Sequence, residues 1–163
     1  MGKTNEKNFP SMTTPQKTIL FLCTGNYYRS RFAEELFNSL ATERLPAWKA
    51  VSRALAIDRG FQNHGPISIH ALNELARRNL FLTHPIREPL QCMEVDLADA
   101  DHIIALKEEE HRPQLEKSFP IWTDRVEYWH IHDVDQASPE ESLGAIFSQV
   151  DRLILELASD SQA

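Results

Sequence analysis

An unbroken apolar run that ends directly at a short polar loop constrains the fold of this chain most strongly. Residues 18–22 read TILFL, and β-branched and aromatic side chains in such a run are typical of a strand buried on both faces of a parallel sheet. From Ser30 onward, apolar residues recur at helical spacing, with polar residues between them: Phe32, Ala33, Leu36, Phe37 and Leu40. The sequence therefore predicts a strand, a loop and a helix in direct succession.

Three further runs have the character of strands and alternate with helical segments. They are Trp48–Leu55, His102–Leu106 and Val126–Ile131. Strands that alternate with helices favour right-handed crossovers, with helices covering both faces of the sheet. We therefore predict an α/β three-layer sandwich with a four-stranded parallel sheet.

Helix boundaries and irregular segments can also be predicted. Ser68 is placed to cap one helix, and Ser138, followed by proline and two glutamates, is placed to open a long final helix. Residues 80–97 are expected to be irregular. The helix that follows the third strand is expected to break near Pro113.

Composition limits the class of protein. The 163 residues suit one domain, which we assign to residues 17–160 behind a flexible N-terminal leader of residues 1–16. A formal charge of −7 argues against nucleic-acid and membrane-surface partners, and no stretch approaches the length of a membrane span. Two cysteines provide no disulfide framework, so a cytoplasmic location is expected.

The sequence gives no sign of a cofactor or a metal. No glycine-rich loop with a Lys-Ser pair is present, so we expect no nucleotide cofactor. His130 and His132 would project from one side of a strand, but two ligands do not make a metal site.

The loop between the first strand and the first helix, residues 23–30 (CTGNYYRS), combines a thiol with an anion-binding pattern. Gly25 and Asn26 tolerate backbone angles that turn amides inward, and a helix N-terminus attracts negative charge. These surroundings favour the thiolate of Cys23, to which Ser30 is placed to donate a hydrogen bond. We expect the loop to bind phosphate through Thr24, Gly25, Asn26, Tyr27, Tyr28, Arg29 and Ser30.

This loop resembles the signature of the low-molecular-weight protein tyrosine phosphatase family, a Cys-x5-Arg-Ser motif near the N-terminus with a distant Asp near the C-terminus. The residues that match the motif are Cys23, Gly25, Asn26, Arg29 and Ser30, and a fainter similarity extends over residues 17–157. The resemblance implies a phosphomonoester hydrolase that works through a phosphocysteine at Cys23, with Arg29 holding the phosphoryl oxygens.

The resemblance also implies a late aspartate that acts as general acid and then as general base. Asp133 is the matching position. Asp135 is the rival, because Val134 stands where the family has proline after the acid.

Several positions depart from the family pattern and leave the substrate open. The aromatic residues that usually follow the acid are replaced by residues 135–137, and Tyr27 and Tyr28 are expected to wall the pocket instead. Arg31 and Lys107 are expected to add positive charge near its mouth. The expected partner is a phosphorylated protein or a small phosphomonoester, and the oligomeric state is left open.

Two alternatives follow from the same residues. The first is an arsenate reductase-like enzyme that uses an external thiol, because Cys92, expected on a surface segment, is the only other cysteine. The second is a phosphate-recognising binding module whose chemistry has decayed.

Overall fold

A four-stranded parallel sheet forms the centre of the molecule. The structure, a computed structural model, describes residues 16–82 and 84–161; the predicted leader lies outside these residues except for its last position. The strands are β1 (Lys17–Cys23), β2 (Trp48–Ala54), β3 (His102–Ala105) and β4 (Glu127–Tyr128). Their order is β2-β1-β3-β4, and every pair is parallel, which confirms the predicted sheet.

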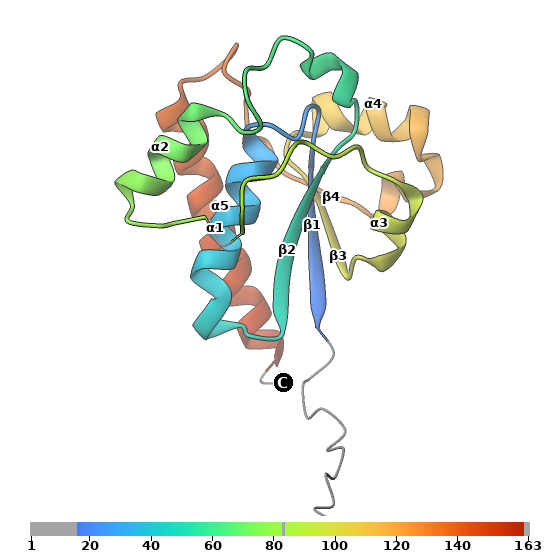
Figure 1. The fold of residues 1–163 in the computed structure, drawn as a ribbon. Coiled ribbons are helices and arrows are strands. Elements are labelled where there is room, and N and C mark those ends of the chain that lie inside the picture. Colours follow the sequence, from blue (N-terminus) through green and yellow to red (C-terminus); the bar gives the residue numbers. More distant parts are fainter. Residues whose placement is uncertain (1–15, 83, 162–163) are drawn as a thin grey trace, which may run out of the picture.

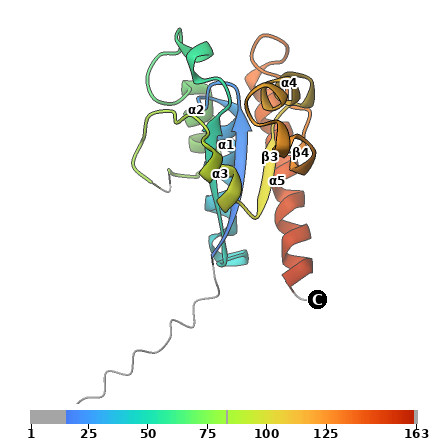
Figure 2. The same ribbon diagram turned by 90° about the vertical axis from the view of Figure 1, so that its right-hand side faces the viewer.

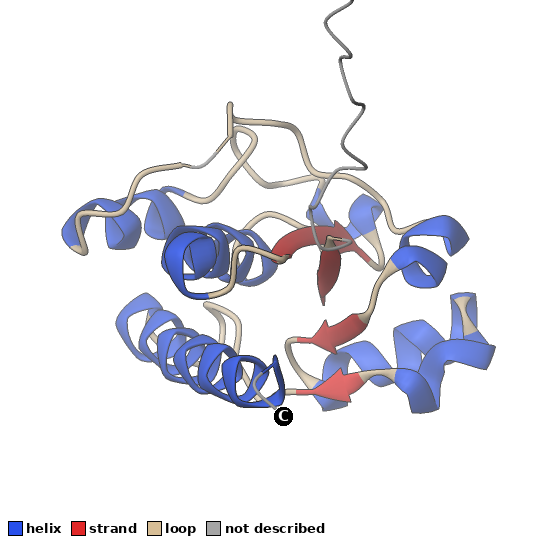
Figure 3. Cartoon of the chain, turned by 90° about the horizontal axis from the view of Figure 1, so that it is seen from below, coloured by secondary structure: helices blue, strands red, loops and turns tan. Residues whose placement is uncertain are grey.

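Helices cover both faces of this sheet, as predicted (Figures 1 and 3). On one face lie α1 (Arg29–Arg44), α2 (Ile69–Arg77) and α5 (Pro139–Ser161); on the other lie α3 (Glu94–Asp99) and α4 (Glu108–Ser118). Two short 3-10 helices, η1 (Ile57–Gly60) and η2 (Pro120–Arg125), complete the described elements. Figure 2 views the molecule from the side of α3 and α4.

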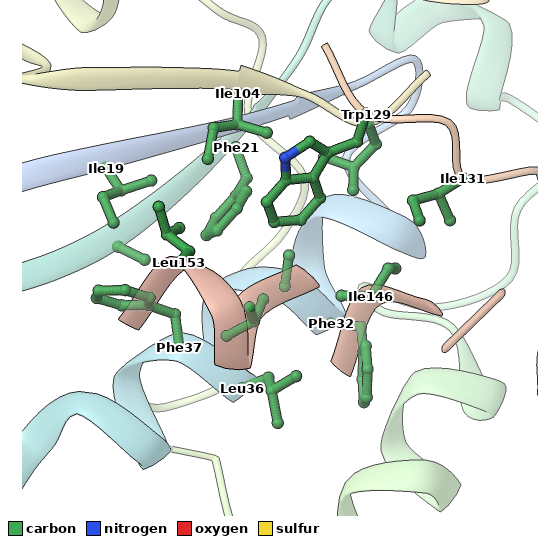
Figure 4. Close-up of a cluster of buried hydrophobic side chains, with 14 of the residues drawn as sticks. Ile19, Phe21, Phe32, Leu36, Phe37, Ile104, Trp129, Ile131, Ile146 and Leu153 are labelled. Carbon is green, nitrogen blue, oxygen red and sulfur yellow. The ribbon is translucent and has the colours of Figure 1, made fainter. Parts of the chain in front are cut away.

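The alternation of side chains along β1 divides the core into two clusters. Ile19 and Phe21 point toward α1 and α5, where Figure 4 shows them among the aromatic and aliphatic side chains of the larger cluster. Leu20 and Leu22 point the other way, toward α3 and α4. Because β1 is buried on both faces, its continuous apolar run was a reliable signal.

Other local predictions had mixed outcomes. The Ser68 hydroxyl accepts a hydrogen bond from the amide of His70 at 3.2 Å, which confirms the predicted cap. The predicted break at Pro113 is wrong, because α4 continues through it to Ser118. Pro113 lies on the exposed face of α4, where water can satisfy the carbonyl group that loses its partner.

Two boundaries differ from the prediction for structural reasons. The fourth strand is shorter than residues 126–131, because only Ile104 and Ala105 of β3 pair with it. The segment 80–97 is irregular up to its last few residues, where α3 begins. None of the helices in the described part of the chain combines the length and the apolar composition that a membrane span requires.

The carboxyl ends of β1, β3 and β4 lie at one edge of the sheet, the upper edge in Figure 1. Three segments leave the sheet at this edge: residues 23–30, the start of α4, and residues 131–137. In open parallel sheets, ligands bind at this edge, where successive connections diverge to opposite faces.

Candidate active site

The loop after β1 carries backbone amides that find no hydrogen-bond acceptor among the described residues. Cys23 is the last residue of β1, and α1 begins at Arg29. Within the described part of the chain, no hydrogen bond is donated by the backbone amides of residues 24–28. These amides and the first turn of a 16-residue helix give the loop the character of an anion-binding site.

The left-handed backbone angle in this loop belongs to Asn26, whose φ is 51°. Gly25, in contrast, does not adopt a positive φ. Asparagine tolerates this conformation better than most residues. The hydrogen bonds of the Asn26 side chain explain why asparagine stands at this position.

Asn26 connects the loop to the cysteine through a short chain of hydrogen bonds. Its Nδ2 atom donates to Ser30 Oγ and to Ser52 Oγ, each at 2.9 Å. Ser30 Oγ also lies 2.9 Å from Cys23 Sγ. Because Ser30 Oγ already accepts from Asn26, its own hydrogen is available to the sulfur.

Arg29 lies at the other end of the loop, and its side chain is only 2% exposed. Its Nη1 atom donates to the backbone oxygen of Ile131 at 3.0 Å, and its Nη2 atom donates to Glu110 Oε2 at 2.7 Å. Asp133 Oδ2 lies 3.4 Å from the same Nη2 atom. Burial alone would lower the pKa of Arg29, but the hydrogen bond with Glu110 and nearby anionic groups raise it above its usual value.

Glu110 is a site residue that the sequence pattern did not predict. Its side chain is 27% exposed, and it accepts hydrogen bonds from Arg29 and from the hydroxyl of Thr24. Burial alone would raise the pKa of Glu110, but His111 and Arg29 hold it well below its usual range. The available signal was an acidic side chain just after a parallel strand, at the edge where Cys23 also lies.

A cavity of about 280 Å³ opens above Cys23. Loop residues and the start of α2 form most of its wall, and the segment after β4 completes it. Its lining is Cys23, Thr24, Gly25, Tyr27, Tyr28, Arg29, Asn63, Ser68, Ile69, His70, Asp133 and Val134. Asp133 therefore shares the cavity with Cys23, whereas Asp135 is exposed and does not line it.

The two tyrosines of the loop both line this cavity, but they differ in their surroundings. The Tyr27 hydroxyl donates to the backbone oxygen of His64 at 2.6 Å, which ties the loop to residues 60–66. Tyr28 is 6% exposed, and its ring packs edge-on against His70. Burial and the charge of Asp133 raise the pKa of Tyr28 to about 12, so its phenol stays protonated.

The predicted positive charges at the mouth are not there. Arg31 is 3% exposed and donates to the backbone oxygens of Pro66 and Arg87 at 2.8 and 2.9 Å. Lys107 is 6% exposed, and its Nζ atom donates to Gln136 Oε1 at 2.6 Å. Both cations are used inside the protein, where they hold neighbouring segments in place.

Cys92 is not on the surface as expected. It is 2% exposed and belongs to the cluster on the α3 and α4 face, while Cys23 belongs to the cluster on the other face. Burial raises the pKa of the Cys92 thiol to about 12. Among the described residues, no group of three or more His, Cys, Asp or Glu side chains is arranged to hold a metal ion.

This combination of fold and anion-binding loop is that of a small phosphatase, and comparison with known proteins identifies the family. The sequence profile of the family described as low molecular weight phosphotyrosine protein phosphatase matches residues 18–158. The chain therefore belongs to this family of enzymes.

Individual relatives agree with this assignment. The human protein described as low molecular weight phosphotyrosine protein phosphatase is 28% identical over 109 residues, which make up 66% of this chain and 65% of that protein. The match therefore spans about two thirds of the length of this relative.

Solved structures show the same fold. YfkJ from Bacillus subtilis superposes with a TM-score of 0.76 at 22% identity, over 90% of this chain and 98% of that one. YwlE arginine phosphatase from Geobacillus stearothermophilus gives a TM-score of 0.70 at 22% identity, over 90% and 96%.

Proposed function

We propose that this protein is a phosphotyrosine-protein phosphatase that works through a phosphocysteine at Cys23, with Asp133 as general acid and base. The observation that carries the proposal is the meeting of Cys23, Arg29 and Asp133 at one cavity. The amides of the adjoining loop have no hydrogen-bond acceptor within residues 16–82 and 84–161. Each of these groups then has one task.

In the first step, the Cys23 thiolate attacks phosphorus while the bond between phosphorus and the ester oxygen breaks. Asp133, protonated at this stage, gives its proton to the departing oxygen. The loop amides and Arg29 hold the equatorial phosphoryl oxygens, on which charge is spread in the transition state.

In the second step, water attacks the phosphocysteine. Asp133, now ionised, takes a proton from that water, and the bond between phosphorus and sulfur breaks to release inorganic phosphate and restore the thiolate. Asp133 is preferred over Asp135 because only Asp133 lines the cavity and approaches Arg29.

The wall of the cavity supports an aromatic phosphoester. Tyr27, Tyr28, Ile69 and Val134 give it apolar surface suited to the ring of a phosphotyrosine. A structural relative is an arginine phosphatase, so phosphoarginine is the competing substrate to test. A thiol relay of the arsenate-reductase kind is disfavoured, since Cys92 is buried on the opposite side of the sheet.

The proposal also places the enzyme in the cytoplasm, because its nucleophilic thiol must stay reduced. Its partners would then be phosphorylated proteins of the same compartment.

The test compares the wild type with Cys23→Ser and Cys92→Ala on 4-nitrophenyl phosphate and on peptides that carry phosphotyrosine or phosphoarginine. We expect wild-type turnover, no turnover by Cys23→Ser, and near wild-type turnover by Cys92→Ala. Faster hydrolysis of the phosphoarginine peptide than of the phosphotyrosine peptide would overturn the proposed substrate class. Phosphate binding without turnover would favour the binding-module alternative.

A further inference from the structure

One carboxylate holds the phosphate-binding loop from outside the cavity. Glu110 is the third residue of α4, which begins just after β3 at the carboxyl edge of the sheet. Its Oε2 atom accepts from Arg29 Nη2 at 2.7 Å and from the hydroxyl of Thr24. Gln114, one turn further along α4, donates from Nε2 to Thr24 Oγ1 at 3.1 Å. The start of α4 is therefore bonded to both ends of the loop.

These contacts fix the guanidinium of Arg29 in one plane. Nη1 is held by the backbone oxygen of Ile131 and Nη2 by Glu110, so both terminal nitrogens are anchored in the protein. The contact of Nη2 with Asp133 is the longest of the three, at 3.4 Å, and is the one that a phosphoryl oxygen can replace. An arginine grips two oxygens well only when its fork has the right orientation.

We propose that Glu110 is a positioning residue that orients Arg29 for the phosphoryl group in the transition state. This inference rests on the proposed phosphatase function. Glu110 lies outside the set of residues that line the cavity, so it acts through Arg29 rather than on the substrate.

The protonation state of Glu110 agrees with this role. Because its pKa is held well below the usual range by His111 and Arg29, Glu110 remains a carboxylate at neutral pH and has no proton to donate. It is therefore not a third candidate for the general acid.

The residue behind Glu110 adds no competing charge. His111 is fully buried, and its Nδ1 atom accepts from the amide of Lys107 at 3.0 Å, which leaves the ring proton on Nε2. Nε2 lies 3.0 Å from Glu110 Oε2, so the ring presents its protonated nitrogen to the carboxylate. Burial lowers the pKa of His111, so the ring faces the carboxylate in its neutral form.

The negative charge of Glu110 makes the inference testable, because removing it should affect phosphate binding and transition-state binding in different ways. A negative charge beside Arg29 repels a phosphate dianion, so neutralising it should leave phosphate binding unchanged or stronger. The same change frees the guanidinium from its alignment, which weakens only those interactions that are tightest in the transition state. A ground-state ligand and a transition-state analogue should therefore respond differently.

The experiment compares Glu110→Gln with Glu109→Gln, a matched change at an exposed neighbour on the same turn. The readouts are kcat on 4-nitrophenyl phosphate and the inhibition constants of inorganic phosphate and orthovanadate. For Glu110→Gln we expect kcat to fall about 10- to 100-fold and the vanadate constant to rise by a similar factor. The phosphate constant should stay within about threefold of wild type or become smaller, and Glu109→Gln should match wild type.

A purely structural role predicts something else. A partly unfolded variant loses kcat but keeps the inhibition constants of its active fraction, so an unchanged vanadate constant would overturn the inference. In an Arg29→Lys background, Glu110→Gln should lower kcat by no more than about a further twofold, because the effect of Glu110 passes through the guanidinium. An undiminished effect in that background would also overturn it.

Failure of the proposed function would be recognised separately. A wild type without turnover overturns the phosphatase assignment, and calorimetric binding of vanadate to the wild type and to Glu110→Gln then still decides the role of Glu110. Weaker vanadate binding by the variant supports alignment of Arg29, and equal binding contradicts it.

Discussion

The choice of general acid can be tested by exchanging one atom in each of two aspartates. Asp133 lines the cavity, and its Oδ2 atom lies 3.4 Å from Arg29 Nη2, whereas Asp135 is exposed and outside the cavity. Asp133→Asn keeps the shape of the side chain but removes its proton chemistry. Asp135→Asn makes the same exchange where no reacting atom is in reach.

The expected magnitude follows from what a positioned acid contributes. General acid catalysis typically supplies about 10²- to 10⁴-fold, which is about 3–5 kcal/mol of activation free energy. The contribution of the acid depends on the leaving group, because a stabilised phenolate departs readily without being protonated. We therefore expect Asp133→Asn to lower kcat/KM, which reports formation of the phosphocysteine, at least about 100-fold on phenyl phosphate and clearly less on 4-nitrophenyl phosphate. Asp135→Asn should stay within about twofold of wild type on both.

Steady-state kinetics on the two aryl phosphates provide the assay, and thermal melting of each variant controls for folding. Equal losses of kcat/KM on both leaving groups would show that Asp133 does not protonate the departing oxygen. A larger loss for Asp135→Asn than for Asp133→Asn would refute the assignment and the geometric reasoning behind it.

Three further predictions concern the reactivity of the two thiols, the packing of the core and the stability of the fold at acidic pH. Iodoacetamide at neutral pH should label Cys23 and spare Cys92, because Cys92 is buried and its pKa is raised to about 12. Peptide mass spectrometry of the labelled native protein measures this, and modification of Cys92 before Cys23 would contradict it. Phe21→Ala should lower the free energy of unfolding, measured in urea titrations, by about 3–5 kcal/mol, because the Phe21 side chain is fully buried between the sheet and α5. A loss below about 1 kcal/mol would argue against that packing. The folded-state pKa of Glu110 lies below the roughly 4.3 of an unfolded chain, so its contribution to stability is present above about pH 4.3 and is lost as the pH falls further. Urea titrations from neutral pH down to about pH 3 should accordingly show a shallower loss of stability for Glu110→Gln than for wild type, and parallel curves would disprove this.

Signals that are local in the sequence predicted the fold well. The apolar run of residues 18–22 became the central strand β1, because a strand buried on both faces needs apolar side chains in both directions. The caps at Ser68 and Ser138 are also contacts between near neighbours, and both form as expected. The loop of residues 23–30 was readable for the same reason, since its strand, turn and helix are contiguous.

The parts that the sequence did not reveal depend on contacts between distant segments. Glu110 meets Arg29 across 81 positions, and nothing in a run of three glutamates marks the one that turns inward. Asn26 Oδ1 accepts from Arg87 Nη1 at 3.0 Å, so a residue in the irregular segment supports the loop. Arg31 was misassigned to the mouth because charge alone does not show that backbone oxygens surround it.

The proposed mechanism requires the sulfur of Cys23 to lie at the floor of a phosphoryl-binding loop closed by Arg29. A crystal structure of the protein grown with orthovanadate would decide this. We expect vanadium bonded to Cys23 Sγ, with its oxygens on the amides of residues 24–28 and on the guanidinium of Arg29. Vanadate bound elsewhere, with Cys23 unmodified and the loop amides turned away, would refute the mechanism.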